Sequence, residues 1–422
     1  MSGYFKWLDF SSAEREQTFS ILASLEEKGT VDDLGIGAVR DAIADHHFPG
    51  ISTIQTRAKY FLFLAWIFQS LEQSQVADER IEASLKEREI KLILALIGDP
   101  AVEKDRDGLI GKEAREKLKR FPSSVYWNGL RAFGICRFEG SLAEYLQAIP
   151  ETRRLRRSSV RKLEASNEPE EEQGNWDGDL PGPPPDYLIG SNFALNVDQA
   201  RYLSERARSL DSPAGDETLL SWCLRNIPSL DPHDFTHIWD LAAMPEMPRH
   251  LGDGLRHARN FSIAVQGAAA VYYVLLARKI NHADVITRYE SELMAWMRDM
   301  AEFSEELCAW FDNIDEFWTW VKLANPRVDR DVSFINTWCA VLRAVKFAPT
   351  QIEQVLTVKT TKLIKDREYS LKRALARLSN PPALKRWEAN VGATPLSYRW
   401  GNATRFISDI RAGLTRREQG DA

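Results

Sequence analysis

Apolar residues recur at helical spacing along most of this chain, and this pattern constrains its fold more than any other feature. In the segment 53–71, for example, Tyr60, Leu64 and Ile67 share one face of a helix. Alternation of apolar and polar residues, which indicates strands, is rare, and 135–139 is the clearest short example. The sequence therefore predicts an all-α protein with few short strands.

The expected helices end where Gly or Pro interrupts this periodicity. The segment 261–277 is apolar enough to raise the question of a membrane span, but it is shorter than the roughly 20 residues that a bilayer requires. We expect a buried core helix there. The expected helices are one that begins at a capping box at 11–14, and those at 38–46, 53–71, 78–97, 112–119, 125–133, 200–210, 217–226, 233–244, 255–280, 284–311, 329–347, 350–378 and 400–412.

A change of composition at 158–185 divides the chain into two parts. The basic run 153–157 is followed by acidic residues and then by a stretch rich in Pro and Gly. Such segments seldom form a packed core. We therefore predict an exposed linker at 158–185, which joins an N-terminal helical domain, 1–157, to a C-terminal helical domain, 186–422.

The segment 111–146 resembles a helix-turn-helix or winged-helix module. It is expected to contain two short helices around a tight turn, followed by a short strand and the start of another helix. Paired short helices also occur in ordinary helical packing. The sequence therefore leaves both interpretations of this segment open.

Composition narrows the functional class. The chain has 422 residues, a net charge of −6 and a pI near 5.8. This acidic balance argues against a surface that coats nucleic acid throughout, but it allows a local basic patch. The four cysteines are far apart and show no metal-binding spacing, and no signal-peptide pattern begins the chain. We expect a cytoplasmic protein with free, buried thiols.

Motifs for cofactors, metals and catalysis are missing. The sequence contains no P-loop and no complete dinucleotide-binding fingerprint. We expect His46 and His47 to be solvated at a helix end, and His233 and His237 to lie one turn apart on a helix; neither pair brings enough ligands together for a metal. No acid–base pair stands out among the many carboxylates. The prediction is no cofactor, no metal and no catalytic residue.

Basic residues interleaved with aromatic residues favour contact with nucleic acid. Arg and Lys neutralise phosphates, while Tyr and Trp stack on bases or sugars. The alternative is a cation–π contact within the protein itself. The predicted nucleic-acid-binding residues are Arg57, Lys59, Tyr60, Arg153, Arg154, Arg156, Arg157, Arg399, Trp400 and Arg405.

A second group of polar residues suggests an anion pocket, formed by Gln55, Arg256, Arg259 and Gln266. Convergence of Gln55, Arg57, Arg256 and Gln266 in one cavity would favour an enzyme that acts on nucleic acid or a nucleotide. The alternative is that the two arginines at 256 and 259 pair with surface carboxylates.

Several blocks of the chain resemble an uncharacterised bacterial family that is defined as a domain of unknown function. The resemblance spans nearly the whole chain. It implies a context, because such genes tend to lie beside helicases and nuclease-like proteins in bacterial defence islands. It implies no catalytic residue. The blocks are 7–11, 34–41, 48–60, 122–127, 180–184, 256–276 and 398–400.

These observations lead to one preferred function and two alternatives. We predict a non-catalytic accessory component of a bacterial anti-phage defence complex, which binds DNA or RNA, helicase or nuclease-like partner proteins, or both, and no membrane. The first alternative is the nucleic-acid or nucleotide enzyme described above. The second is a purely structural adaptor between proteins, which would expose large apolar patches.

Overall fold

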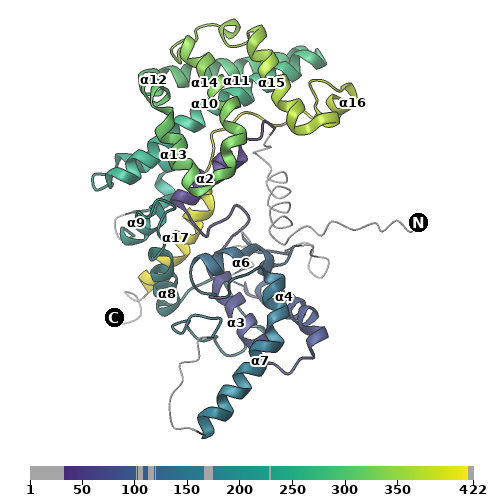
Figure 1. The fold of residues 1–422 in the computed structure, drawn as a ribbon, viewed down its shortest axis with the longest axis vertical. Helices are drawn as coiled ribbons and strands as arrows, with labels where there is room; N and C mark the ends of the chain where they lie inside the picture. The colour runs from purple at the N-terminus through teal and green to yellow at the C-terminus, as the bar shows by residue number, and fades with distance from the viewer. Residues whose placement is uncertain are drawn as a thin grey trace, which may run out of the picture.

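A computed structural model describes residues 33–100, 102, 108–112, 118, 120–165, 174–227 and 230–416 (Figure 1). Helices dominate, and no sheet forms among these residues. The strand-like contacts between them are two isolated bridges, Cys136 with Trp176 and Asp211 with Glu217. The all-α prediction is confirmed. The helix expected from residue 11 and most of the one at 112–119 lie outside the described residues.

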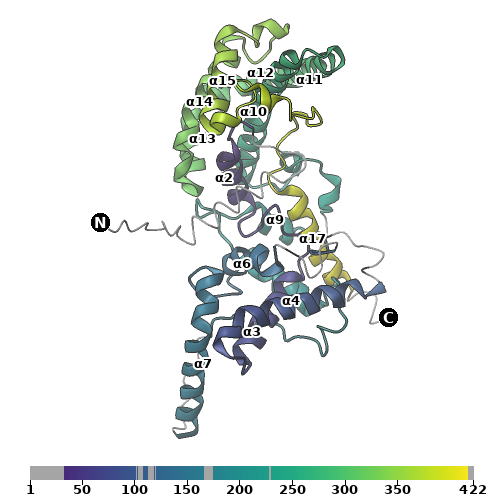
Figure 2. The same ribbon diagram turned by 90° about the vertical axis from the view of Figure 1, so that its right-hand side faces the viewer.

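One end of the elongated molecule is built around a helix that is buried on every side. This helix, α3, contains the run from Tyr60 to Phe68, and each residue of the run is almost completely buried. A helix that is apolar all round must be enclosed by others. Phe68 packs on Trp127, and both lie in an aromatic cluster with Tyr145. The elements here are α3 (Tyr60–Gln73), η1 (Asp78–Arg80), α4 (Ile81–Ile97), α6 (Pro122–Ala132) and α7 (Leu142–Ala165), the last of which extends away from the body (Figures 1 and 2).

The other end is organised by the long helix α10. Two indole N–H groups from neighbouring helices donate to its backbone, Trp296 to Ile263 O at 2.8 Å and Trp338 to Ala264 O at 2.7 Å. Gly267 permits this close approach, because a Cβ atom there would lie 2.0 Å from the Trp296 ring. The elements are α10 (Arg249–Ile280), α11 (Ala283–Glu302), α12 (Ser304–Asp312), α13 (Ile314–Ala324), η5 (Pro326–Val328), α14 (Asp329–Ala344), η6 (Ile352–Gln354), α15 (Val358–Lys372), η7 (Arg373–Leu375) and α16 (Pro381–Leu384).

Among the described helices, α10 is the one that is long and apolar enough to cross a membrane. However, 78% of its apolar window is buried inside the fold. A core helix of a globular protein can have the same length and apolar composition as a membrane span. Here α11, α14 and α15 pack against α10 and cover its apolar residues. The expected core helix at 255–280 is therefore present, with an earlier start at Arg249.

Between the two ends lies a junction where distant parts of the chain meet. Helix α17, near the C-terminus, packs against α8, α9 and η3 (Figures 1 and 2). Helix α2 comes from the N-terminal half but packs against α10 and α13. The predicted division at 158–185 therefore places α2 in one part of the chain and its packing partners, α10 and α13, in the other. The elements are α2 (Gly37–His47), α8 (Val197–Arg208), α9 (Leu219–Arg225), η3 (Pro232–Asp234), η4 (Ile238–Ala243) and α17 (Trp400–Thr415).

The described part of the expected linker, 174–185, is packed rather than fully exposed. The Trp176 ring is buried and stacks on Phe68 with ring centroids 5.5 Å apart. The indole of Trp66 donates a hydrogen bond to Pro181 O at 2.7 Å. Aromatic contacts and several hydrogen bonds, including two that Asn175 and Trp176 donate to Glu72, hold this Pro- and Gly-rich stretch against α3 despite its composition.

Four expected helices differ from the observed ones, and the one at 350–378 is divided into η6, α15 and η7. The segment 53–59 is a turn rather than the start of α3, because the N–H groups of Thr56 and Arg57 donate to the Tyr126 hydroxyl at 2.8 and 3.0 Å. The expected helix 284–311 is divided into α11 and α12 at Phe303. The expected helix 233–244 is replaced by the 3₁₀ turns η3 and η4.

Candidate functional site

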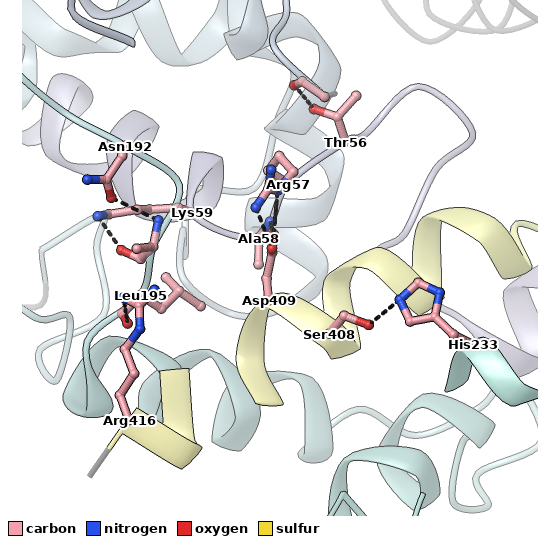
Figure 3. A network of polar contacts seen from close by, with 12 residues as sticks. Thr56, Arg57, Ala58, Lys59, Asn192, Leu195, His233, Ser408, Asp409 and Arg416 are labelled. Carbon is pink, nitrogen blue, oxygen red and sulfur yellow. Dashed lines mark hydrogen bonds and ion pairs between the residues drawn. The ribbon is translucent and has the colours of Figure 1, made fainter. Parts of the chain in front are cut away.

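Arg57, the first of the predicted nucleic-acid contacts, is a structural cross-link at the junction. Its Nη2 lies 2.9 Å from Asp409 Oδ1, and its Nε is 3.1 Å from both carboxylate oxygens (Figure 3). The Ala58 N–H donates to the same carboxylate at 2.9 Å. The guanidinium also lies over the Phe193 ring at 4.7 Å. Arg57 therefore makes a cation–π contact within the protein, the alternative to nucleic-acid binding, together with a bidentate ion pair.

Lys59 and Tyr60 are buried. The Lys59 ammonium donates to Ala194 O at 2.6 Å, and burial lowers the pKa of this lysine to about 8 (Figure 3). The Tyr60 hydroxyl accepts a hydrogen bond from the Ile110 N–H at 3.1 Å, and its ring is fully enclosed. Neither side chain presents a charge or a ring face to a strand of nucleic acid.

The arginines of α7 divide into an internal and an exposed group. Arg153 is buried and donates to Leu71 O and Val76 O at 2.8 and 2.7 Å, so it satisfies carbonyls at the end of α3. Arg154 is exposed and pairs with Glu151. Arg156 is also exposed, and the side chain of Arg157 lies outside the described residues.

Arg399 and Trp400 lie at the N-terminus of α17. Arg399 adopts a left-handed backbone conformation with φ of 64°, which is uncommon for a residue with a side chain. Its guanidinium donates to Asp45 Oδ1 at 2.5 Å and to Ile51 O at 2.9 Å. The buried indole of Trp400 donates to Phe235 O at 2.8 Å. These contacts fix the orientation of the N-terminus of α17.

The residues of the predicted anion pocket do not meet. Gln55 is buried and donates to Gly50 O at 3.1 Å, whereas Gln266 donates to Ala393 O at 2.9 Å. Arg256 pairs with an acid on its own helix, and Arg259 pairs with Glu306, as the carboxylate alternative predicted. Positions 256 and 266 of one helix are roughly 15 Å apart along its axis. One small ligand cannot contact all four predicted residues.

A different pocket lies beside the first turns of α17, between this helix and η3. Its volume is about 450 Å³, within the usual range for small-molecule sites. Three predicted residues, Arg57, Trp400 and Arg405, line it although they come from opposite ends of the chain. The other lining residues are Pro232, His233, Phe235, Gly401, Thr404, Ser408 and Asp409.

Two residues with hydroxyl groups, Thr404 and Ser408, line this α17 pocket. The Ser408 hydroxyl and His233 Nε2 are 3.0 Å apart (Figure 3). Thr404, one turn earlier on the same helix face, is 7% exposed, and its hydroxyl has no hydrogen-bond partner. His233 reaches the pocket from η3, so its place in a 3₁₀ turn, rather than the expected helix, determines this geometry.

A surface that the sequence analysis missed is the outer face of α15 and η7. Lys359, Lys365 and Arg373 are exposed there, and none has an ion-pair partner among the described residues. Lys362 lies between them and pairs with Asp366 of the same helix. The spacing of three residues places Lys359, Lys362 and Lys365 on one side of the helix, and Arg373 follows directly in η7. We call Lys359, Lys362, Lys365, Tyr369 and Arg373 the α15 basic face.

The opposite face of α15 is anchored in the core by cations that do have partners. Arg367 donates to Asp331 Oδ1 at 2.6 Å and to Leu34 O at 2.8 Å. The buried Glu368 carboxylate accepts hydrogen bonds from the Tyr272 hydroxyl at 2.6 Å and from the Arg377 N–H at 2.8 Å. This anchoring fixes the rotation of α15 and so determines which of its cations face solvent.

A charge count would have found this region. Residues 358–386 contain nine Lys or Arg and two Asp or Glu, a net charge of +7 in a chain of net charge −6. The pattern of basic residues interleaved with aromatic residues does not mark this segment, because Tyr369 is its one aromatic residue. Net charge over a window is therefore the stronger signal here.

The histidines expected at a solvated helix end are instead buried. The His46 ring stacks on Trp320 with centroids 4.0 Å apart, and its Nε2 lies 2.8 Å from Trp320 O. Burial lowers the pKa of His47 to about 3 and that of His257 to about 4. The described residues contain no group of three or more His, Cys, Asp or Glu that is arranged to hold a metal ion.

The cysteines are free thiols, as expected. Burial raises the pKa of Cys136 to about 11 and that of Cys339 to about 12. Both thiols therefore stay protonated at neutral pH, which disfavours their use as nucleophiles.

The chain belongs to a family of unknown function, DUF6361, whose sequence profile matches residues 1–413. This confirms the expected match to a domain of unknown function over nearly the whole chain. No curated protein and no solved structure matches the chain. The family assigns no activity, so a function must be argued from the surfaces described above.

Proposed function

We propose that this protein binds nucleic acid, without catalysis, through the α15 basic face. The observation that carries the proposal is the contrast between this face and the rest of the molecule. Lys359, Lys365 and Arg373 are exposed there without an ion-pair partner among the described residues, whereas the whole chain has a net charge of −6. Concentrated positive charge on an acidic protein attracts a polyanion to one place.

The geometry of the face suits a phosphate backbone. Lys359 and Arg373 are separated by roughly 21 Å along a helical path. Double-stranded DNA carries one charge per roughly 1.7 Å of its axis, so several phosphates lie within that reach. The contacts are side-chain ammonium and guanidinium groups rather than a shaped groove. This arrangement favours binding that depends strongly on salt and weakly on sequence.

Tyr369 adds an aromatic group to the same face. Its side chain is 51% exposed and lies one turn from Lys365 and from Arg373. An exposed tyrosine between cations provides a surface on which an unpaired base can stack. We therefore expect single strands to bind at least as well as duplexes.

The wider role that we propose is that of an accessory component of a bacterial defence complex in the cytoplasm. This part of the proposal depends on the family resemblance, which implies neighbouring helicases and nuclease-like proteins. A protein that holds nucleic acid but does not cut it would supply such enzymes with substrate.

The test is a salt-titrated binding measurement with labelled single-stranded and double-stranded DNA. The variant Lys359→Glu/Lys365→Glu/Arg373→Glu reverses three exposed charges. We expect its affinity at low salt to fall by about a hundredfold or more, and the slope of log affinity against log salt to fall by about three.

A matched control reverses three exposed cations elsewhere, Lys86→Glu/Arg201→Glu/Arg249→Glu, each of which has an acidic partner within its own helix. The change in net charge is the same. The proposal fails if the wild type shows no affinity at low salt, or if the control weakens binding as much as the α15 variant does.

A role as a protein-binding adaptor is the second candidate, and one observation favours it. Four of the large apolar side chains that the described residues expose lie in or next to α15, namely Val358, Tyr369, Leu371 and Leu375. Leu375 is 63% exposed. If Leu375→Ser abolished binding of a helicase or nuclease-like protein from the same system, while DNA affinity stayed unchanged, the adaptor role would be favoured.

A further inference from the structure

We propose that the α17 pocket binds a phosphate monoester, carried either by a small molecule or by the end of a nucleic-acid strand. This inference is separate from the α15 basic face. It depends on four features of the pocket: an unsatisfied buried hydroxyl, neighbouring hydrogen-bond donors, a favourable charge balance and sufficient volume.

The unsatisfied group is the hydroxyl of Thr404. It is buried, and no hydrogen-bond partner lies within reach. Buried polar groups are nearly always hydrogen-bonded, and leaving one without a partner costs about 1–3 kcal/mol. A ligand oxygen in the pocket would accept this hydrogen bond and recover that cost. The position of Thr404 in the pocket wall therefore indicates an acceptor ligand.

Further donors surround the same space. Ser408 lies one helical turn from Thr404, and when His233 Nε2 carries its proton, the imidazole donates to Ser408 and leaves the hydroxyl hydrogen for a ligand. Gly401 lies in the first turn of α17, and its N–H donates no hydrogen bond within the described part of the chain. The open amides of a first helical turn favour a negatively charged ligand.

The charge balance also favours an anion. Arg405 supplies a cation to the pocket wall. The one carboxylate in the lining, Asp409, already accepts bonds from Arg57 and from the Ala58 N–H, so its charge is compensated. The nearby carboxylate of Asp231 pairs with Arg411 at 2.6 Å. The charges of these two carboxylates are therefore compensated by arginines.

The volume points to an ester rather than to phosphate alone. At about 450 Å³, the pocket holds more than a tetrahedral anion. Pro232 and Phe235 add apolar groups to the pocket lining. An organic group attached to the phosphate would fill this part of the pocket.

The experiment measures binding by calorimetry with three probes: inorganic phosphate, adenosine monophosphate, and an oligonucleotide with or without a 5′-phosphate. The variants are Thr404→Val and Ser408→Ala. We expect each to weaken the binding of a phosphorylated probe by about tenfold or more, the usual effect of losing one hydrogen bond to a charged group. Thr415→Val, on the same helix but outside the pocket, is the control and should bind normally.

A stability measurement separates ligand binding from a structural role. Thr404→Val removes a hydroxyl that bonds to nothing, so the free energy of unfolding should stay unchanged or rise while the affinity falls. Tighter binding of the 5′-phosphorylated than of the 5′-hydroxyl oligonucleotide would identify a strand end as the source of the phosphate. Equal binding of the two oligonucleotides, together with binding of adenosine monophosphate, would identify a small molecule.

The proposal is overturned if no phosphorylated probe binds, or if probes bind equally to the wild type and to both pocket variants. The α15 charge-reversal variant provides an independent reference. It should keep its affinity for adenosine monophosphate, so loss of nucleic-acid binding at α15 and loss of ligand binding at α17 are measured separately.

Discussion

The junction around Arg57 and the α15 basic face are both rich in cations, but the junction cations form ion pairs whereas several cations of the α15 basic face are exposed. At the junction, Arg57 is held by Asp409, and Arg399 by Asp45, across more than 350 residues of sequence. On α15, Lys365 and Arg373 are exposed without an acidic partner among the described residues. A basic residue next to an aromatic residue therefore indicates either a cross-link or an interface, depending on which distant residues the fold brings to it.

The two regions also use their cations differently. The junction cations tie α17, near one end of the chain, to the turn before α3, near the other (Figure 3). Removing them should affect folding and leave ligand affinity alone. The exposed cations of the α15 basic face, Lys359, Lys365 and Arg373, are in contact with water. Removing them should lower the affinity for nucleic acid and leave folding unaffected. Three predictions test this contrast in order of decreasing effect.

Arg57→Ala should have the largest effect on stability. It leaves the Asp409 carboxylate, whose side chain is only 9% exposed, without its bidentate partner, and breaking an ion pair that is largely shielded from water costs about 3–5 kcal/mol. Urea unfolding measures the loss, while the DNA affinity of the folded variant should match the wild type. Arg154→Ala is the control, since this exposed pair contributes about 0.5 kcal/mol or less. Equal losses in the two variants would contradict the contrast.

Acid should destabilise the protein through its buried histidines, which stay neutral in the folded state. Burial lowers the folded-state pKa of His46, of His47 to about 3 and of His257 to about 4, so the unfolded chain takes up protons first as the pH falls through about 6.5. Stability should therefore decrease below that pH, by about 1 kcal/mol each for His47 and His257 at pH 5.5.

Urea midpoints at pH 7.5 and 5.5 measure this effect. His47→Leu should reduce the difference between the two midpoints by the share of one histidine. An unchanged difference would show that His47 is not kept neutral by its surroundings.

Lys59→Met should have the smallest effect. The variant loses the hydrogen bond to Ala194 O, but it also removes a cation that burial disfavours, so stability at pH 7 should change by less than about 1 kcal/mol. Because burial lowers the folded-state pKa of Lys59 to about 8, the unfolded chain binds the extra proton above that pH. The wild type should gain stability relative to Lys59→Met as the pH rises from 8 towards 10. A parallel pH profile would contradict this account.

Sequence patterns predicted the helical class and most helix positions, because burial of an apolar face at a period of 3.6 residues is a local property. They were wrong at 53–59 and at 233–244. At 53–59 the backbone N–H groups of Thr56 and Arg57 donate to the hydroxyl of Tyr126. At 233–244 the chain forms the two 3₁₀ turns η3 and η4. The contacts that override local periodicity there are mostly distant in sequence.

The site was less predictable than the fold. Arg57, Trp400 and Arg405 were chosen from the sequence as surface contacts, and the structure places them around one pocket for reasons that no local pattern contains. Thr404 and Ser408 carried no signal in the sequence, since single hydroxyl groups are common. His233 was noted only for its spacing from His237, which predicted a helix rather than a pocket. The net charge of 358–386 was present in the sequence and would have indicated the α15 basic face.

The amino-acid sequence by itself determined that this chain is helical, that its thiols are free and that its positive charge is concentrated near α15. These properties depend on composition and on the spacing of neighbours. Only the tertiary structure decided which cations are neutralised and which remain exposed. The physical reason is that ion pairing depends on distances of a few ångströms between side chains that can be more than 350 residues apart, as with Arg57 and Asp409.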